Sequence, residues 1–170
     1  MTDAAQVRLS AEQAHWVQGP LSVVVGTCGS VGRPHAARAV GCCVSPDRGS
    51  VTVVLQASTA TQSLDDLRSD RRIAVVFSDP LTHHSLQVKG TAERIEPAGP
   101  AGRELSQLWV RAFAHRLKGT VPDTWTPEAL AGVMLTGAAD DLFFVTVRLR
   151  AIFDQTPGPA AGAAVGTHAN

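Results

Sequence analysis

Six short segments rich in valine, leucine, isoleucine and threonine alternate with turn residues along most of this chain. Short runs of β-branched and other apolar residues, bounded by glycine, proline, aspartate and serine, are typical of strands. Only one short helical pattern interrupts them before the fifth segment, so consecutive strands are joined mostly by turns. The sequence therefore predicts an antiparallel barrel and not a doubly wound α/β sheet. The predicted strands are 21–27, 33–44, 51–55, 72–77, 85–96 and 142–153.

Four further segments have helical patterns. The first begins with a capping-box pattern, a serine followed three residues later by a glutamine. The second lies between the third and fourth strands, and the third has apolar residues on one face until Gly119 ends it. The predicted helices are 10–19, 59–70, a long one from Leu105 to Leu117, and a smaller one between Thr126 and Gly137.

The length of 170 residues fits one domain with its own core. We expect residues 1–153 to form that single domain. Residues 154–170 are rich in alanine, glycine and proline and contain few large apolar side chains. This tail is therefore predicted to be poorly ordered or laid over a neighbour.

The 15 basic and 15 acidic residues give a formal net charge of zero. Nucleic acid and anionic membrane surfaces are therefore not expected partners, and a small molecule or another protein is. No apolar run approaches the roughly 20 residues of a membrane helix, and the first eight residues lack the basic-then-apolar order of a secretory signal. We expect a cytoplasmic protein.

The three cysteines show no CxxC spacing. Cys42 and Cys43 are neighbours, so on a strand their side chains would point to opposite faces. With none beside a clear helix start, all three are predicted to be buried thiols and not reactive ones.

Three histidines invite a metal or haem interpretation, because neutral imidazole is a common ligand. His83 and His84 are adjacent and diverge if extended, and no carboxylate or cysteine stands at a helical ligand spacing beside them. We therefore expect them, with His35, to be turn histidines at a pocket rim, and expect no metal site. His115 and Arg116 lie off the apolar stripe of their helix and are predicted to face solvent.

Three motifs carry a resemblance to a known family. They are Gly32-Arg33-Pro34-His35 before Arg38, the run Asp70-Arg71-Arg72-Ile73-Ala74-Val75-Val76-Phe77, and Gly90-Thr91-Ala92-Glu93-Arg94-Ile95. In their order and spacing the chain resembles the pyridoxamine 5'-phosphate oxidase-related family of FMN-binding split barrels. The resemblance implies a mainly β fold, a six-stranded antiparallel split β-barrel with flanking helices.

The resemblance also implies a homodimer that holds one FMN per subunit at its interface and acts as an oxidoreductase on a small-molecule substrate. By position, one strand would line the flavin ring, the next would end at Gln56 and Ala57, the start of the second helix would meet the phosphate, and the fifth strand would approach the cofactor. The cofactor-binding residues so implied are Arg38, Ala39, Val40, Gln56, Ala57, Thr61, Gln62, Ser63, Ser85 and Gln87. Ser58 and Thr59, which add hydroxyls at the start of the second helix, and the cation of Lys89 complete the set of candidates.

The chain departs from the family pattern in two places. The family pattern places the phosphate at residues 61–63. Gln62 and Ser63 stand where the best-known members have an arginine and a lysine that bind it. Hydroxyls and backbone N–H groups at the start of a helix can still hold a phosphate. The alternative is that the hydroxyl residues here only cap the helix. Nothing after Phe153 matches the aromatic and arginine pair that binds substrate in the true oxidase, so pyridoxamine phosphate is not an expected substrate.

Reduced flavin gains negative charge near its pyrimidine edge, so a nearby cation favours reduction. Arg38 and Lys89 are the candidates, with a solvated strand position as the alternative for Lys89. Trp109, Phe113 and Trp125 are candidates for the dimer interface, with core packing as the alternative for the first two.

Two other functions stay open at this stage. One is a non-catalytic binding module that kept the barrel and lost FMN. The other is a relative that binds a deazaflavin or haem.

Overall fold

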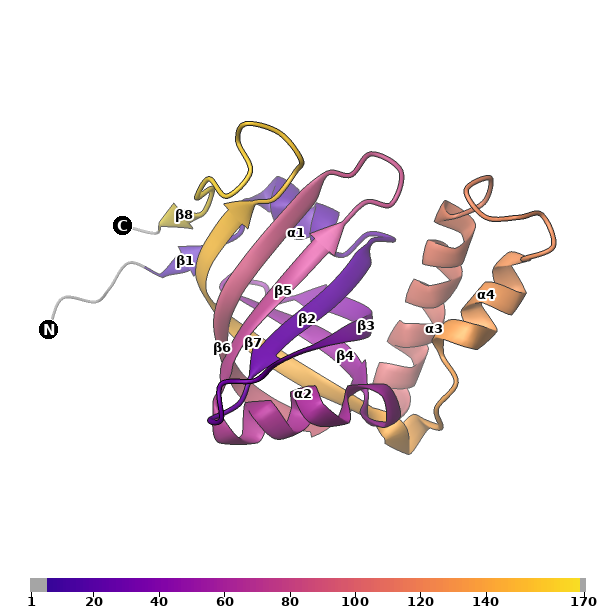
Figure 1. Ribbon diagram of the computed structural model, residues 1–170, viewed down its shortest axis with the longest axis horizontal. Coiled ribbons are helices and arrows are strands. Elements are labelled where there is room, and N and C mark those ends of the chain that lie inside the picture. Colours follow the sequence, from indigo (N-terminus) through magenta and orange to yellow (C-terminus); the bar gives the residue numbers. More distant parts are fainter. Residues whose placement is uncertain (1–5, 169–170) are drawn as a thin grey trace, which may run out of the picture.

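Six antiparallel strands close into a barrel in the order β2-β3-β4-β7-β6-β5 (Figure 1). The structure, a computed structural model, describes residues 6–168. The fold is therefore the predicted six-stranded antiparallel barrel with flanking helices. The barrel strands are β2 (Ser22–Cys28), β3 (Pro34–Val44), β4 (Ser50–Gln56), β5 (Arg72–Ser78), β6 (Ser85–Pro97) and β7 (Leu142–Asp154).

The helices lie outside the barrel. One crosses an end of it beneath β2 and β3, and two others form a pair beside it, the first of which packs on β3 and β7 (Figure 1). No helix in the described part of the chain is both long and apolar enough to cross a membrane. The helices are α1 (Ala11–Val17), α2 (Ala57–Ser69), α3 (Gly99–Arg116), α4 (Pro127–Met134) and a short 3₁₀ turn, η1 (Ala139–Asp141).

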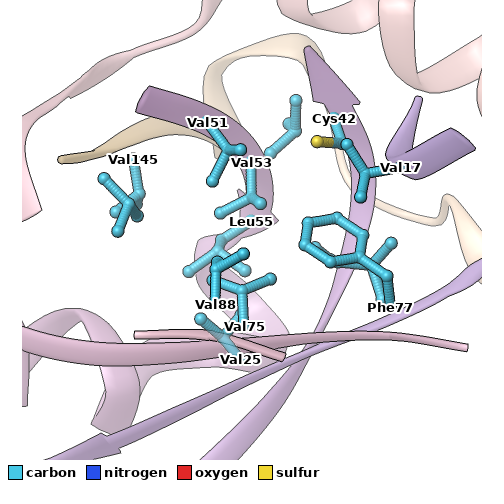
Figure 2. Packing of buried hydrophobic residues seen from close by; sticks show 14 of the residues in the cluster. Val17, Val25, Cys42, Val51, Val53, Leu55, Val75, Phe77, Val88 and Val145 are labelled. Carbon is cyan, nitrogen blue, oxygen red and sulfur yellow. The ribbon is translucent and has the colours of Figure 1, made fainter. Parts of the chain in front are cut away.

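Alternation along the strands fills the barrel with apolar side chains. On β5, Ile73, Val75 and Phe77 point inward and are buried, while the residues between them face outward. Figure 2 shows Phe77 and Val75 packed with residues of the other strands in the interior. Burial of each such side chain contributes about 1.5–3 kcal/mol, so the inward pattern fixes which face of each strand is left for function.

The start of α1 has the capping chemistry expected from its sequence. The Ser10 hydroxyl accepts the Gln13 N–H at 3.0 Å, and the Gln13 side chain accepts the Ser10 N–H at 2.8 Å, which confirms the predicted capping box. Helix α3 begins at Gly99, earlier than the predicted Leu105. Pro100 suits its first turn, where no N–H partner is needed, and that turn lacks the apolar stripe used to predict the helix.

The segment after β7 folds back on the same chain. The Asp154 N–H donates to Ala163 O at 2.9 Å, and the Val165 N–H donates to Ile152 O at 2.9 Å. Further on, β8 (Thr167–His168) pairs with β1 (Val7–Arg8). Backbone hydrogen bonds therefore hold the described part of the tail over β7 and β1, and such bonds need no large side chains.

Two sequence expectations require correction. Only Cys42 is a fully buried thiol, since Cys28 and Cys43 are half-buried; burial raises the pKa of Cys42 and Cys43. Arg116 does not simply face solvent, because its Nη2 lies 2.6 Å from Asp79 Oδ2. Burial raises the pKa of the Asp79 carboxyl, but hydrogen bonds from Arg116 and two backbone N–H groups outweigh it and leave that pKa below its usual range.

Candidate functional site

The outer face of β2, β5 and β6 carries an open hollow of about 580 Å³. It lies on the side of these strands that faces away from the core. Because it faces solvent, this hollow, the strand groove, can take a ligand without disturbing the packed interior. Its walls include Gly26, Arg72, Ala74, Lys89, Gly90 and Arg150.

A row of very small residues, the small-residue floor, crosses the strand groove and continues onto β3. Gly26 lies in register with Ala36 on β3 and with Ala74 on β5. A Cβ added at Gly26 would meet only the Ala74 carbonyl oxygen, at 4.0 Å, so packing within the chain does not require glycine there. The missing side chain instead leaves a flat surface across three strands, which suits a planar ring.

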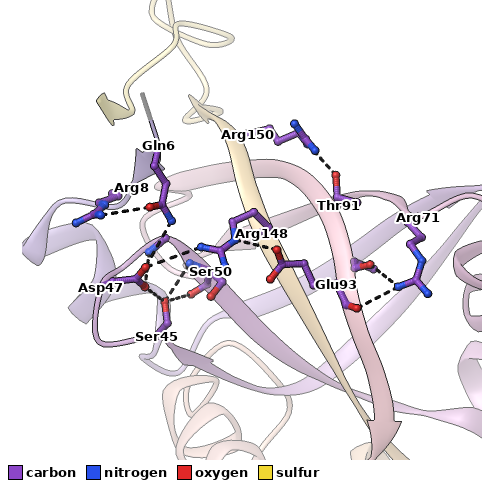
Figure 3. Close-up of polar contacts among 12 residues, drawn as sticks. Gln6, Arg8, Ser45, Asp47, Ser50, Arg71, Thr91, Glu93, Arg148 and Arg150 are labelled. Atoms are coloured by element: carbon purple, nitrogen blue, oxygen red, sulfur yellow. Dashed lines mark hydrogen bonds and ion pairs between the residues drawn. The ribbon is translucent and has the colours of Figure 1, made fainter. Parts of the chain in front are cut away.

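Three basic side chains line the strand groove. The Lys89 Nζ lies 5.0 Å from the centre of the Phe153 ring, and the Arg150 Nε donates to Thr91 Oγ1 at 2.8 Å (Figure 3). Arg72, by contrast, is paired with a carboxylate of Asp70 at 2.6 Å. Among the described residues no carboxylate pairs with Lys89 or Arg150, so the strand groove carries positive charge and favours an anionic ligand.

Three of the predicted cofactor residues come together on this outer face. Arg38 on β3 is in register with Val24 on β2. Val24 is in turn opposite Val76 on β5, and Val76 is opposite Gln87 on β6, so these residues form one row across four strands. Lys89 lies one row further along β6, opposite Ala74. The exposed Arg38 reaches Ser22 Oγ at 3.4 Å. This row therefore places the guanidinium of Arg38 and the side-chain amide of Gln87 beside the small-residue floor.

Other predicted residues on β3 and β6 are less accessible. Ala39 and Val40 are buried, at an irregular point of the β3–β4 pairing. Ser85 is buried too, and its hydroxyl lies 2.8 Å from Ser78 Oγ and donates to His83 O at 3.0 Å.

The Gln56 side chain fixes the segment that follows α4. Its Nε2 donates to Met134 O at 2.8 Å, and its Oε1 accepts the N–H groups of Thr136 and Gly137, both at 3.1 Å. Gln56 is only 4% exposed. All three contacts are with backbone, so this amide is occupied within the chain.

The start of α2 holds a carboxylate where the sequence placed a phosphate. The Ser58 N–H and hydroxyl donate to Asp141, at 2.9 and 2.6 Å. The Thr59 and Thr61 hydroxyls donate to carbonyls of the preceding turn, and Ser63 is buried. The half-buried Ala57 precedes them, and Gln62 is exposed on the helix surface. A phosphate at this position would meet the negative charge of Asp141.

A polar cluster under the strand groove was not predicted. Asp66 on α2 accepts from Thr27 Oγ1 at 2.8 Å and lies 2.8 Å from His35 Nδ1. The hydrogen bond with His35 is the main cause of the lowered pKa of Asp66, with the bond from Thr27 adding to it against the effect of burial. At Gly29 a Cβ would lie 2.6 Å from Asp66 Oδ1. The cluster ties the β2–β3 hairpin to α2, and its members are too far apart in sequence to be paired by spacing.

The aromatic residues considered for a dimer interface divide into two groups. Trp109 and Phe113 are buried and stack with ring centres 5.2 Å apart, which confirms core packing for both. Trp125 is 48% exposed. His84 lines a separate hollow near Trp16, as expected for a histidine at a pocket rim.

A closed six-stranded antiparallel barrel with a helix across one end and an open, positively charged outer face defines a split-barrel protein. The profile of the family described as pyridoxamine 5'-phosphate oxidase matches residues 9–129. That match covers well over half of the chain. The chain therefore belongs to the pyridoxamine 5'-phosphate oxidase family.

Solved structures share the fold at low identity. HupZ from Group A Streptococcus is 15% identical, with a TM-score of 0.53, over 91% of this chain and 100% of that one. An F420 reductase is 17% identical, with a TM-score of 0.54, over 85% of this chain and 98% of that one. A candidate pyridoxamine 5'-phosphate oxidase from Lactobacillus delbrueckii is 14% identical, with a TM-score of 0.52, over 86% and 93%. A search of curated proteins found no match.

Proposed function

We propose that this chain is a cytoplasmic, homodimeric FMN-dependent oxidoreductase that acts on a small molecule. The observation that carries the proposal is the strand groove, a floor of small residues bordered by Lys89 and Arg150, neither of which has a carboxylate partner among the described residues. Adjacent strands lie about 4.8 Å apart, so three of them give a floor about 10 Å wide. A planar three-ring system fits a floor of that width, and its phosphate fits the positive charge beside it.

We assign the flavin ring to the floor formed by Ala36, Gly26 and Ala74. Arg38 then stands at the pyrimidine edge, and Gln87 lies in the same row. The positive charge of Arg38 would favour the reduced, more negative state of the ring. FMN, when bound, supplies hydride or electron transfer, and the chain positions the ring and shields one of its faces.

We assign the phosphate to Lys89 and Arg150. Both cations lack a carboxylate partner among the described residues and line one groove. Residues 61–63, the position implied by the family pattern, include no cation, and the carboxylate of Asp141 binds Ser58 in the turn just before them. Charge therefore favours the strand groove over the start of α2.

We assign the homodimer interface to the same outer face. Val24 is 36% exposed there, and the neighbouring Val76 is half-buried. A second copy laid over these apolar side chains would cover the outer face of the ring and exclude water from it.

One observation favours a second candidate, a deazaflavin-binding relative. Asp141 holds the start of α2, and Gln62 with Ser63 replaces the basic pair, so the usual FMN phosphate position is weakened. A protein with the same fold is called an F420 reductase. A haem-binding relative and a non-catalytic module are further outcomes of the same experiment.

The experiment is to record the visible spectrum of the purified protein and identify any released cofactor by mass, then titrate with FMN, riboflavin, the deazaflavin F420 and haem. We expect saturable FMN binding at least about tenfold tighter than riboflavin binding, because one charged hydrogen bond to phosphate is worth that much. A colourless protein that binds none of the four would be the non-catalytic module. Saturable binding of F420 alone would establish the deazaflavin candidate instead.

A further inference from the structure

A second hollow, of about 430 Å³, lies between α3 and α4. We call it the helix groove; it shares no lining residue with the strand groove. Arg103, Gln107, Arg111 and His115 line its α3 side. They are spaced four residues apart and therefore lie along one face of the helix, over about 18 Å at a rise of about 1.5 Å per residue.

Apart from Glu128, the opposite wall of the helix groove is apolar. Pro127 and Ala131 of α4, and Leu135 just after it, are again four residues apart and line the same hollow. Gly132 stands beside them, and a Cβ added there would meet nothing within 4 Å. A row of hydrogen-bond donors thus faces an apolar wall across open space, an arrangement that fits a molecule with one polar end and an apolar body.

The donors of the helix groove are largely unused. Arg103 donates to the carbonyl of Gly137, which holds it against the chain. The side chains of Gln107, Arg111 and His115 have no hydrogen-bond or ion-pair partner among residues 6–168. An unpartnered guanidinium in a groove is a ready partner for a carboxylate, which it can bind through two parallel N–H bonds.

The charge of the helix groove favours a ligand with a single negative charge. Arg103 and Arg111 contribute two positive charges and Glu128 one negative charge, so the arginine and carboxylate side chains together leave one positive charge. A phosphate dianion would exceed that charge and would meet the Glu128 carboxylate. A monocarboxylate matches it.

We propose that the helix groove binds a monovalent organic anion, a carboxylate with an apolar tail. Its carboxylate bonds to Arg111, and its tail lies along Pro127, Ala131 and Leu135. The proposal uses none of the residues assigned to the flavin, so it stands or falls independently of the cofactor.

Isothermal titration of the full chain with decanoate tests this site, with decanol and inorganic phosphate as comparison ligands. Arg111→Gln removes the charge but keeps a polar side chain, and Gly132→Phe fills the groove from a helical position with open space around it. The matched controls are Arg94→Gln, an exposed arginine on β6, and Ala129→Phe, an exposed position on α4 that does not line the groove.

We expect saturable binding of one decanoate per chain, weakened at least about tenfold by Arg111→Gln, since a hydrogen bond to a charged group is worth that much. Gly132→Phe should abolish binding, and both controls should keep it. Absence of saturable decanoate binding, tighter binding of phosphate, or equal affinity in the wild type and Arg111→Gln would each overturn the proposal. If Gly132→Phe fails to fold, as judged by circular dichroism, Arg111→Gln alone decides.

Discussion

The carboxylate of Asp141 accepts both the backbone N–H and the hydroxyl of Ser58, at 2.9 and 2.6 Å. Ser58 stands in the short turn that opens α2, before the kink at Ala60, so a negative charge already occupies this end of the element. A phosphate bound at the same place would have to displace this carboxylate or tolerate it. The relationship explains why we assign the phosphate to Lys89 and Arg150.

Asp141→Asn tests whether the phosphate lies at Lys89 and Arg150 or at the start of α2. The amide keeps an oxygen acceptor but loses the charge, so the free energy of unfolding should fall by about 0.3–1 kcal/mol. FMN affinity, measured by quenching of flavin fluorescence, should not change, because the phosphate lies elsewhere. Clearly tighter FMN binding in Asp141→Asn would instead locate the phosphate at the start of α2.

Lys89→Gln and Arg150→Gln should weaken the binding of FMN but not the binding of riboflavin. Each change removes one positive charge from the strand groove, so FMN affinity should fall about tenfold while riboflavin affinity stays near the wild-type value. Arg148→Gln is the matched control, since Arg148 lies two residues before Arg150 on β7 and pairs with Glu93 at 3.0 Å, outside the groove (Figure 3). Equal losses for both ligands would show that these cations do not contact phosphate.

Gln56→Ala should unfold more easily without losing FMN. Truncation leaves one carbonyl and two N–H groups of the segment after α4 without their partner. Each such group costs about 1–3 kcal/mol where water does not reach it. Urea unfolding measures the stability, and an FMN titration at low temperature measures affinity. A large loss of FMN affinity in folded protein would restore Gln56 as a cofactor residue.

The cluster of Asp66, His35 and Thr27 predicts a dependence of stability on pH. Hydrogen bonds hold the pKa of Asp66 below its unfolded value of about 3.9. Its stabilisation is therefore fully present above that unfolded value and is lost as pH falls through the lowered folded pKa. The urea midpoint should fall between pH 6 and pH 3, and less so in Asp66→Asn.

Other carboxylates with lowered pKa values contribute to the same fall, so a control is needed. Asp65→Asn, at the exposed neighbouring position, should leave the difference between the two pH values almost unchanged. An identical fall in wild type and Asp66→Asn would remove Asp66 from this explanation.

The strands were predictable because the inward and outward positions of each strand follow from the residues of that strand alone. On β5 the alternation of Ile73, Val75 and Phe77 with smaller or polar residues sets the inward face, and the outward face follows. The same rule brings Arg38, Gln87 and Lys89 to one side of the barrel. The local sequence pattern therefore predicted both the fold and the face of the barrel that carries the candidate site.

The contacts that decide the phosphate position were not predictable in this way. Ser58 and Asp141 are 83 residues apart, and Gln56 binds backbone groups 78 to 81 residues further along. Such pairs form only when closure of the barrel brings the ends of β4 and β7 together, and they leave no periodicity in the sequence. The start of α3 was missed for a local reason, because its first turn has no large apolar residue.

The central claim is that FMN lies on the floor at Gly26, and an FMN titration of Gly26→Val tests it most directly. A Cβ there has only ordinary contact with Ala74 O, and valine favours strands, so the fold should be kept. Ser30→Val, in the exposed hairpin loop, is the control. We predict a melting temperature close to wild type and FMN affinity at least about tenfold weaker, because the branched side chain would occupy the place of the ring. Folded Gly26→Val that binds FMN as tightly as the wild type would contradict the account.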